Sequence, residues 1–248
     1  MAKEEISMQG YFDIHCHILP GIDDGPKTLE ETLRMLYIAY EEGIRVIVAT
    51  PHYASDGQSD SQAKIQAMYN EINAEIEQAG LEISIILGNE LLYCTGIIEA
   101  LDRGDALTID GTRYILIEFH PDSSYKEIWN GINQCIFGGY IPIVAHVERY
   151  QCLIKNPGLV GELIHLGAYI QMNVSSIKGK ISDSRMHFCN KILKKGWVHF
   201  LGTDAHGAYD RVPQVKSYLK ALKKKLGEER IQQLFWENPM TMLENKHL

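Results

Sequence analysis

The chain has 248 residues, of which 45% are hydrophobic and 23% are charged, a balance typical of an ordinary globular protein. Its net charge of −8, without a strongly basic block, argues against duplex nucleic acid as the main partner. The apolar runs are too short for a membrane span and the charged N-terminus lacks a signal peptide's apolar stretch, so we expect a cytoplasmic protein without membrane insertion.

Seven short runs rich in Val, Ile and Leu predict β-strands. They are nearly continuous in apolar residues, as in strands of a parallel sheet that is buried on both faces. In chain order, the expected strands are Tyr11–Cys16, Arg45–Ala49, Ile83–Leu87, Tyr114–Phe119, Ile141–Ala145, Tyr169–Val174 and Val198–Gly202.

Amphipathic segments between these runs predict helices. The first begins after Thr28, which forms a capping box with Glu31, and ends at Gly43. Four later segments also end on glycine before a strand, and two more complete the chain. The later helices are expected within Ala63–Gly80, Tyr125–Gly138, Pro157–Gly167, Ser184–Gly196, Val212–Gly227 and Glu228–Glu237.

The alternation of strands and helices predicts an α/β fold. Seven βα units suggest a TIM-like barrel one strand short of the usual eight. A doubly wound open sheet is the alternative, weakened because no glycine-rich phosphate loop follows the first strand. No linker or break in composition marks a second domain, so we expect a single domain over residues 1–248.

Side chains of the kinds that bind metals lie at or just past the C-terminal ends of the expected strands. In an α/β barrel these ends form one rim, where such folds carry out chemistry. One such residue is weak evidence, since a lone H-x-H motif or strand-end Glu is often structural, but strand after strand contributes one. The candidate ligands are His15, His17, Asp24, His52, Glu90, Glu118, His146, Asp204 and His206.

Alternation along a strand strengthens the metal hypothesis. His15 and His17 should point the same way, with Cys16 opposite, and Asp204 and His206 should likewise lie together. Imidazole mixed with carboxylate suits borderline divalent metals such as Zn²⁺, Mn²⁺ or Fe²⁺. Nine candidates exceed the needs of one tetrahedral ion, so two or three ions are expected.

Two arginines follow candidate ligands closely. Arg149 lies three residues after His146, and Arg211 lies five residues after His206. Guanidinium groups bind phosphate oxygens in bidentate fashion, which favours a phosphoryl substrate. The structural alternative is that each arginine pairs with its acidic neighbour, Glu148 or Asp210.

Other titratable residues receive a structural interpretation. His165, His187 and His199 fall away from the rim and are expected to be packing or surface residues, whereas His120 and Asp122 follow the fourth strand and remain open. A cysteine-based phosphatase is excluded because no cysteine stands six positions before an arginine. The five cysteines also form no disulfide framework: they are Cys16, Cys94, Cys135, Cys152 and Cys189.

Two stretches are more specific than single residues. D-I-H-C-H-I-L-P-G-I-D-D-G-P begins at Asp13, and H-V-E-R-Y begins at His146. With the strand-end ligands, they resemble the PHP superfamily, named for polymerase and histidinol phosphatase. Within it the resemblance is to the bacterial tyrosine-protein phosphatases of capsular and exopolysaccharide operons, and it runs from about Tyr11 to the end of the chain.

The resemblance implies a distorted seven-stranded (βα) barrel with a trinuclear site, usually supported by Mn²⁺, with Fe²⁺, Zn²⁺ or Mg²⁺ as further options. It also implies that Arg149 and Arg211 bind phosphate, and that Asp204 and His206 belong to the catalytic set. Substrate selectivity would lie in residues 53–57. The implied ligand sets are His15, His17, Glu90 and Asp204 for one ion, Glu90, Glu118 and His146 for a second, and Asp24, His52 and His206 for a third.

The implied activity is hydrolysis of phosphotyrosine on a cytoplasmic tyrosine kinase that controls capsule or exopolysaccharide synthesis. The hypothetical mechanism is in-line attack by activated water, with charge on the phosphoryl oxygens absorbed by metals and arginines. Two alternatives stay open: a small-molecule phosphatase of histidinol-phosphate type on the same scaffold, and a non-catalytic binding module. The sequence does not give the oligomeric state.

Overall fold

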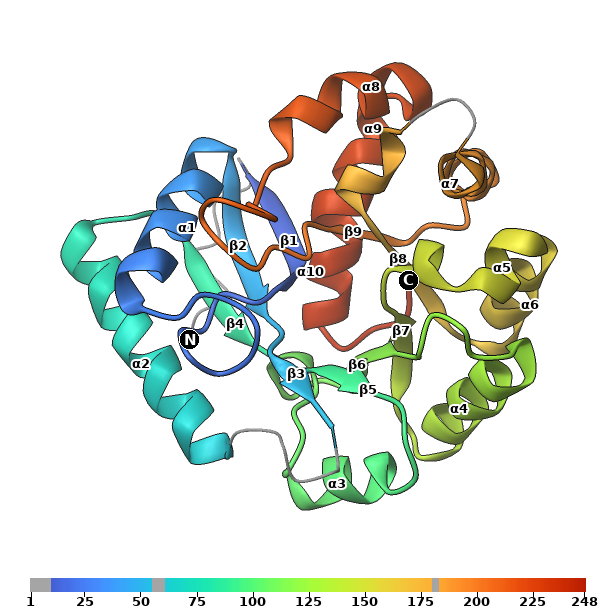
Figure 1. The fold of residues 1–248 in the computed structure, drawn as a ribbon, viewed down its shortest axis with the longest axis horizontal. Coiled ribbons are helices and arrows are strands. Elements are labelled where there is room, and N and C mark those ends of the chain that lie inside the picture. Colours follow the sequence, from blue (N-terminus) through green and yellow to red (C-terminus); the bar gives the residue numbers. More distant parts are fainter. Residues whose placement is uncertain (1–9, 55–60, 180–182) are drawn as a thin grey trace.

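The protein is described by a computed structural model that covers residues 10–54, 61–179 and 183–248. In Figure 1, the strands run through the centre of the molecule and most helices lie around them. The strands are β1 (Tyr11–Cys16), β2 (Ile44–Ala49), β3 (His52–Tyr53), β4 (Ser84–Leu87), β5 (Glu90–Leu92), β6 (Tyr114–Glu118), β7 (Ile141–Val144), β8 (Tyr169–Asn173) and β9 (Phe200–Gly202).

The helices carry the chain back between successive strands. The α-helices are α1 (Leu29–Glu41), α2 (Gln62–Ala79), α3 (Ile97–Arg103), α4 (Tyr125–Phe137), α5 (Gln151–Lys155), α6 (Gly158–Leu166), α7 (Ser184–Lys194), α8 (Lys216–Leu226), α9 (Glu228–Gln232) and α10 (Asn238–Leu243). Short 3₁₀ turns are η1 (Ile109–Gly111), η2 (Val147–Arg149) and η3 (Val174–Ile177), and a π turn, η4, spans Gln233–Glu237. No helix among these described residues is long and apolar enough to cross a membrane.

The strands form a curled parallel sheet. They pair in the orders β1-β2-β4 and β3-β5-β6-β7-β8-β9, and every one of these pairs is parallel. The two groups meet where β2 leads into β3 and β4 into β5, since Gly88 N donates to Ala49 O at 2.9 Å and Glu90 N to Pro51 O at 3.2 Å. At the far edge, His17 N donates to Ala205 O at 2.9 Å, so the end of β1 meets the segment after β9.

Side chains alternate between two apolar layers along the sheet. Val46 and Val48 belong to a cluster that fills the inside of the curl, where Trp236, Met242 and Leu243 from the C-terminal elements pack. The intervening residues Ile47 and Ala49 pack in the larger layer between sheet and helices. Burial on both faces explains why the strands read as continuous apolar runs.

A β-bulge in β1 sets the direction of the first histidines. Asp13 pairs with Ile47 whereas Cys16 pairs with Ala49, so β1 carries one extra residue between these pairs. Ile14 lies in the inner apolar cluster, and the bulge turns His15 to the inside of the curl as well. His15 and His17 then face one another, as alternation predicts, while Cys16 packs in the outer layer.

The seven expected strands are all present, with bounds that agree within two residues. Two short strands, β3 and β5, were not expected, because two or three residues give no periodic signal. The helices α3, α5 and α10 were likewise missed for their shortness, and the segment expected over Glu228–Glu237 is α9 followed by the π turn η4. The curled sheet, with helices around it, favours the barrel-like alternative over a doubly wound open sheet.

The expected start of α1 is half right. Thr28 Oγ1 accepts from Glu31 N at 3.2 Å, as an N-cap residue should. The carboxylate of Glu31, however, accepts from Lys27 N at 3.0 Å, so it does not make the second hydrogen bond of a capping box, to Thr28 N. Gly43 follows the helix with φ of 85°, a left-handed conformation that favours glycine and ends α1 before β2.

His199, expected to be a packing residue, is partly buried and accepts a backbone hydrogen bond. Its Nδ1 accepts from Ile170 N at 3.1 Å, and its ring meets that of Tyr169 edge-on at 5.0 Å between centroids. Burial, helped by the charge of Arg230, lowers the pKa of His199 from 6.5 to about 4. The folded protein therefore keeps this ring neutral at pH values at which the unfolded chain protonates it.

We predict that His199 makes the fold sensitive to acid. As the pH falls from 6.5 to 4, the unfolded chain gains a proton that the folded one lacks, so the free energy of unfolding should fall by about 3 kcal/mol from this group alone. Denaturant unfolding in excess chelator across this pH range measures the slope. His199→Gln should flatten it, and His247→Gln, at an exposed residue, should not. Equal slopes in both variants would contradict the prediction.

Candidate metal centre

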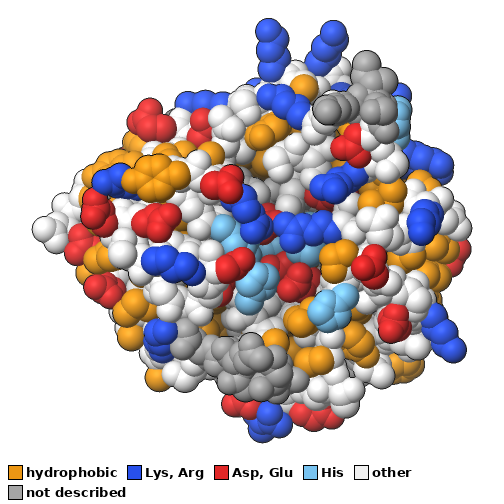
Figure 2. Space-filling model, in the orientation of Figure 1, with side chains coloured by type: hydrophobic (Ala, Val, Ile, Leu, Met, Phe, Trp, Pro, Cys, Tyr) orange, Lys and Arg blue, Asp and Glu red, His pale blue; other side chains and the backbone are white. Residues whose placement is uncertain are grey.

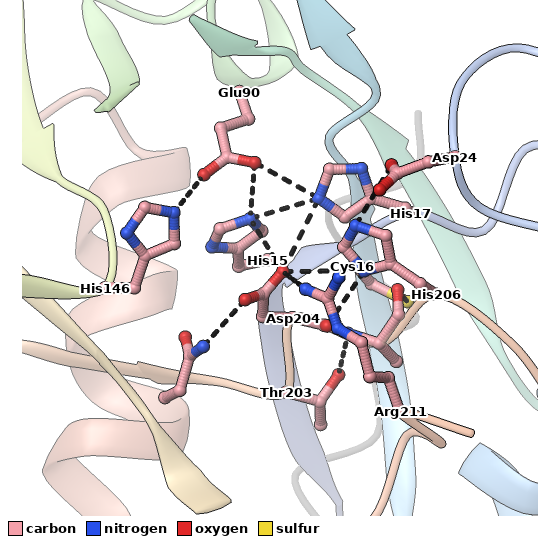
Figure 3. A network of polar contacts seen from close by, with 12 residues as sticks. His15, Cys16, His17, Asp24, Glu90, His146, Thr203, Asp204, His206 and Arg211 are labelled. Carbon is pink, nitrogen blue, oxygen red and sulfur yellow. Dashed lines mark hydrogen bonds and ion pairs between the residues drawn. The ribbon is translucent and has the colours of Figure 1, made fainter. Parts of the chain in front are cut away.

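All nine candidate ligands converge at one end of the curled sheet. They come from the ends of β1, β2, β4, β6, β7 and β9, where each strand passes into its loop or into a short extension. In Figure 3, Glu90 and Asp204 stand between the rings of His15, His17, His146 and His206. Eight of the nine candidates, all except His146, form three groups in which the donor atoms lie within 4.8 Å of one another.

The first group consists of His15, His17, Glu90 and Asp204 and is completely buried. Glu90 Oε2 lies 3.1 Å from His15 Nε2 and 3.2 Å from His17 Nε2. Asp204 Oδ1 lies 3.6 Å from His15 Nε2 and 3.7 Å from His17 Nε2. Two imidazoles and two carboxylates thus face one point, in the set that the sequence analysis grouped around one ion.

The second group consists of His52, Glu90 and Glu118. His52 Nδ1 lies 3.2 Å from Glu90 Oε2 and 3.4 Å from Glu118 Oε1. His146 was expected in this group but lies beside it, with its Nε2 at 2.6 Å from Glu90 Oε1 and 3.4 Å from Glu118 Oε2. His52 was expected in the third group alone and belongs to both the second and the third.

The third group lies at the exposed side of the centre. Asp24 Oδ1 is 3.2 Å from His206 Nε2 and 3.5 Å from His52 Nε2, and His17 also belongs to this group. His206 Nδ1 lies 3.0 Å from the carbonyl oxygen of Asp204, to which it donates. The lone pair of His206 is therefore on Nε2, which faces Asp24. Asp24 is the most exposed of the nine, with 63% of its side chain accessible.

Asp23 is a residue that the sequence analysis passed over. Its Oδ2 lies 2.7 Å from His17 Nδ1 and accepts from His52 N at 3.0 Å, while its Oδ1 accepts from Gly25 N at 2.9 Å. A carboxylate on the rear nitrogen of a histidine fixes the ring and points its other nitrogen at a metal. The adjacent Asp23 and Asp24 were visible in the sequence, but spacing could not tell which one faces inward.

Gln171 and Asn173 on β8 support the centre in the same way. Gln171 Oε1 lies 3.4 Å from His15 Nδ1 and also accepts from the backbone N–H of His146. Asn173 Nδ2 donates to Asp204 Oδ2 at 2.7 Å. These amides hold three of the candidate ligands, and β8 contributes no candidate ligand of its own.

Three backbones at the centre adopt left-handed conformations that are rare for residues other than glycine. His146 has φ of 28°, Asp204 has φ of 54° and Arg211 has φ of 48°. Such conformations cost free energy and persist where the surrounding structure fixes them, commonly at functional sites. They turn two ligands and one arginine inward from the ends of their strands.

Mutual charge determines the ionisation of the buried carboxylates. Burial alone would raise the pKa of Glu90, but the charges of His15 and His146 outweigh it and hold the pKa well below its usual range. Burial likewise opposes the low pKa of Asp204, which the charges of His15 and Arg149 bring to about 2. Both carboxylates are therefore anionic in the neutral pH range and require positive charge beside them.

Histidines supply part of this positive charge in the metal-free chain. Burial would lower the pKa of His17, yet its contacts with Asp23 and Glu90 raise it to about 10. His146 is raised in pKa to about 9, because Glu90 outweighs its burial. Burial, the charge of His17 and that of Arg211 lower the pKa of His206 to about 4, so this ring stays neutral.

The donor set fits divalent metal ions. It offers imidazole nitrogens and carboxylate oxygens that converge from separate strands, and most of these side chains are buried. Buried carboxylates are stable only when paired or bound to a cation. A divalent ion in each group would replace the protons that His17 and His146 otherwise carry, since metal ligands must be deprotonated.

Arg149 and Arg211 lie at the edge of the centre and both contact Asp204. Arg149 donates to Oδ2, and Arg211 Nη2 donates to Oδ1 at 2.8 Å. The alternative of side-chain pairing with Glu148 and Asp210 is wrong for both arginines. Glu148 turns inward to accept from Asn173 N at 2.9 Å, and Asp210 accepts only from the backbone of Arg211 among the described residues.

The remaining titratable residues lie outside the three groups. His120 and Asp122 are exposed and belong to none of these groups, and His165 bonds to Gly161 O within α6. Cys16 is fully buried, and burial raises the pKa of its thiol well above the usual value. A thiolate nucleophile is therefore disfavoured here, in agreement with the sequence analysis. Of the expected selectivity loop, residues 55–57 lie outside the described residues.

The sequence matches a known family over nearly its whole length. The family described as "Capsular polysaccharide synthesis, CpsB/CapC" matches residues 11–244. The tyrosine-protein phosphatase CpsB of Streptococcus agalactiae is 34% identical over 241 residues, covering 95% of this chain and 99% of that protein. The tyrosine-protein phosphatase YwqE of Bacillus subtilis is 29% identical over 234 residues, covering 94% and 92%.

Solved structures show similarity to the same tyrosine phosphatases. A structure described as one of YwqE from Bacillus subtilis and CpsB from Streptococcus pneumoniae, "unique metal-dependent tyrosine phosphatases", superposes with a TM-score of 0.87 at 28% identity, covering 96% of each chain. Histidinol phosphate phosphatase from Lactococcus lactis, complexed with zinc, L-histidinol and phosphate, has a TM-score of 0.58 at 16% identity, covering 89% and 94%. The second likeness shows a shared fold and nothing finer.

We predict that Asp23 supports metal binding without being a ligand. Asp23→Asn removes the charge behind His17, and the loss of such a partner typically weakens metal affinity about 10–100-fold. Competition between the protein and a chromogenic chelator for Mn²⁺ measures the change. Asp122→Asn, at an exposed carboxylate near the same rim, should leave the affinity unaltered. Equal affinities in wild type and Asp23→Asn would contradict the supporting role.

Proposed function

The chain belongs to the CpsB/CapC family of capsular polysaccharide synthesis, and on that premise we propose that it is a metal-dependent protein-tyrosine phosphatase. The observation that carries the proposal is the convergence of three metal-type donor groups with two arginines that contact the same carboxylate, Asp204. A metal centre flanked by guanidinium groups suits a doubly charged phosphoryl group. The relatives named tyrosine-protein phosphatases match along nearly their whole length.

We infer a seven-stranded barrel for the scaffold, with residues 1–248 acting as one PHP-type phosphatase domain. Counting β2 with β3 and β4 with β5 as two interrupted strands gives seven. The backbone contact between Cys16 and Ala205 supports closure of the curl. The interruptions fall at Pro51, which has no N–H to donate to the sheet, and at Gly88-Asn89, just before the ligand Glu90.

The proposed ligand sets follow the three donor groups, with Glu90 shared between the first and second and with His146 added to the second for its contacts with Glu90 and Glu118. Two or three ions fit, and Mn²⁺ is the proposed metal, since mixed imidazole and carboxylate ligands suit a borderline divalent ion. When bound, such ions lower the pKa of water and neutralise charge on phosphoryl oxygens. The proposed ligands are His15, His17, Asp24, His52, Glu90, Glu118, His146, Asp204 and His206.

The chain's own residues bind and orient the phosphoryl group. Arg149 and Arg211 approach Asp204 from the side of an adjoining pocket, so their guanidinium groups stand where phosphate oxygens arrive. A metal ion on Asp204 would neutralise its charge, which would leave both guanidinium groups to donate to phosphate oxygens. Both remain charged at any working pH, and their bidentate geometry matches the equatorial oxygens in the transition state.

The proposed substrate is phosphotyrosine on a protein, in particular a cytoplasmic tyrosine kinase of capsule or exopolysaccharide synthesis. The support is the family match and the names of the relatives. The phenolate of tyrosine is a moderate leaving group, with a reference pKa of about 10. Side-by-side turnover of a phosphotyrosine peptide and of histidinol phosphate separates this function from a small-molecule phosphatase of the same fold.

Chelation should abolish the activity, and Mn²⁺ should restore it. The reason is that the proposed nucleophile is water activated by bound ions, and Cys16, the cysteine beside the centre, is buried with a raised thiol pKa. The measurement is turnover of a phosphotyrosine peptide after dialysis against excess chelator, before and after Mn²⁺ is added. Undiminished turnover by protein that is shown to contain no metal would contradict the metal-dependent mechanism.

Arg149→Ala and Arg211→Ala should each lower kcat/KM by roughly 2–4 kcal/mol, the scale for removing one preorganised charge-stabilising group. Arg→Lys at either position should recover only part, because a point charge cannot reproduce the bidentate contact. Steady-state kinetics on a phosphotyrosine peptide, with metal content determined in parallel, measure the effect. Arg103→Ala, which removes an exposed ion pair with Asp105 at 2.7 Å, is the matched control. Near-wild-type kcat/KM in both variants would contradict the proposal that the two arginines bind the phosphoryl group.

A further inference from the structure

A polar pocket of about 420 Å³ adjoins the metal centre on the side of the arginines. Four parts of the chain form its walls: the end of η2, the β8–η3 junction, the first turn of α7, and the segment from Thr203 to Tyr218. Its volume lies in the range of pockets that hold small ligands. Figure 2 shows Lys and Arg side chains over a hollow at the centre of this face, with acidic and His side chains beneath.

The pocket has one more arginine than the proposed reaction uses. Arg149 and Arg211 contact Asp204 at the inner edge, next to the candidate metal ligands. Arg185, from the first turn of α7, lines the same pocket and is exposed. Among the described residues its guanidinium group pairs with no carboxylate, and only its backbone N–H is bonded, to Asp183 Oδ1 at 2.9 Å.

The acidic side chains of the pocket do not neutralise Arg185. Glu148 is 1% exposed and its Oε1 accepts from Asn173 N at 2.9 Å and from Ser176 Oγ at 2.8 Å. Asp204 is held by the other two arginines, and Asp210 accepts from Arg211 N at 2.9 Å. Lys178 Nζ lies 4.5 Å from the ring centre of Tyr218, which lines the pocket. Arg185 therefore stands in the outer part of the pocket without an ion pair to a lining carboxylate.

The distances in an extended peptide suit a second anion in this pocket. A residue one or two positions from phosphotyrosine lies within roughly 4–7 Å of it along the backbone, and its side chain reaches further. The pocket shares its inner arginines with the metal centre, so a peptide whose phosphotyrosine lies there brings its neighbours to Arg185. Carboxylate and phosphate oxygens both suit a guanidinium group.

We propose that the outer part of this pocket, built around Arg185, is a second anion subsite that binds a carboxylate or second phosphate beside the phosphotyrosine of the same substrate. This inference rests on the proposed phosphatase function and adds a substrate class to it. The preferred substrates are peptides in which acidic residues or further phosphotyrosines flank the reacting one. Arg185 is a specificity-determining residue and does not touch the reacting atoms.

The test compares four substrates with Mn²⁺ present. Three are peptides of equal length with one reacting phosphotyrosine flanked by Glu, by Gln, or by a second phosphotyrosine, and the fourth is p-nitrophenyl phosphate. Wild type should prefer the Glu or the doubly phosphorylated peptide over the Gln peptide in kcat/KM, and the preference should shrink as salt rises. The peptide with the larger preference tells whether carboxylate or phosphate is the natural occupant.

Arg185→Glu is the decisive variant. It should lower kcat/KM on the preferred peptide about tenfold or more, the scale of one charge-assisted hydrogen bond, and leave the Gln peptide and p-nitrophenyl phosphate within about twofold. Lys194→Glu makes the same change of charge in the last turn of α7, away from the pocket lining. It should leave kcat/KM unchanged on all four substrates. This control separates a local contact at Arg185 from general electrostatic attraction.

Three results would overturn the subsite. Equal turnover of the Glu, Gln and doubly phosphorylated peptides by wild type would remove its selectivity. An equal loss on all four substrates in Arg185→Glu would place the phosphotyrosine itself at Arg185. An equal effect of Lys194→Glu would reduce the preference to long-range attraction. Turnover of none of the four substrates would overturn the proposed phosphatase function and the subsite with it, so the two failures are distinguishable.

Discussion

Glu90 is a fully buried carboxylate at the meeting point of four imidazoles, and the functional end of the molecule depends on it. Its oxygens lie within 3.2 Å of nitrogens of His15, His17, His52 and His146, which come from three different strands or their extensions. A buried anion is tolerated only where positive charge surrounds it. The raised pKa values of His17 and His146 provide part of this charge, and in the proposed enzyme divalent ions would provide it.

The curled parallel sheet brings these side chains to one end of the molecule, and local irregularities of the backbone orient them. A bulge turns His15 inward, an interruption at Gly88-Asn89 brings Glu90 to the centre, and left-handed backbones turn His146 and Asp204. Each irregularity departs from regular strand geometry and costs free energy. They concentrate at the end of the sheet where the ligands meet, whereas the opposite end is filled by apolar side chains from the C-terminal elements.

Asp204 connects the metal centre to the substrate. Its Oδ1 faces His15 and accepts from Arg211, and its Oδ2 accepts from Arg149 and Asn173. The same carboxylate therefore orders two arginines when no substrate is present and serves as a ligand in the proposed enzyme. Beyond these arginines the pocket continues to Arg185, which in our proposal binds an anion beside the reacting group of the substrate.

The sequence by itself determined the α/β class and predicted which residue types would meet at one end of the sheet. Continuous apolar runs fixed the seven long strands, because strands buried on both faces leave no polar alternation, and the nine ligand-type residues followed from their places at the strand ends. Strands of two or three residues, such as β3 and β5, are too short to show a periodic pattern of apolar residues. Only the tertiary structure decided that Asp23 supports His17, that His52 belongs to two donor groups and that both arginines contact Asp204. The reason is that these contacts join strands far apart in the chain, and their geometry depends on a bulge and on backbone turns that no local pattern records.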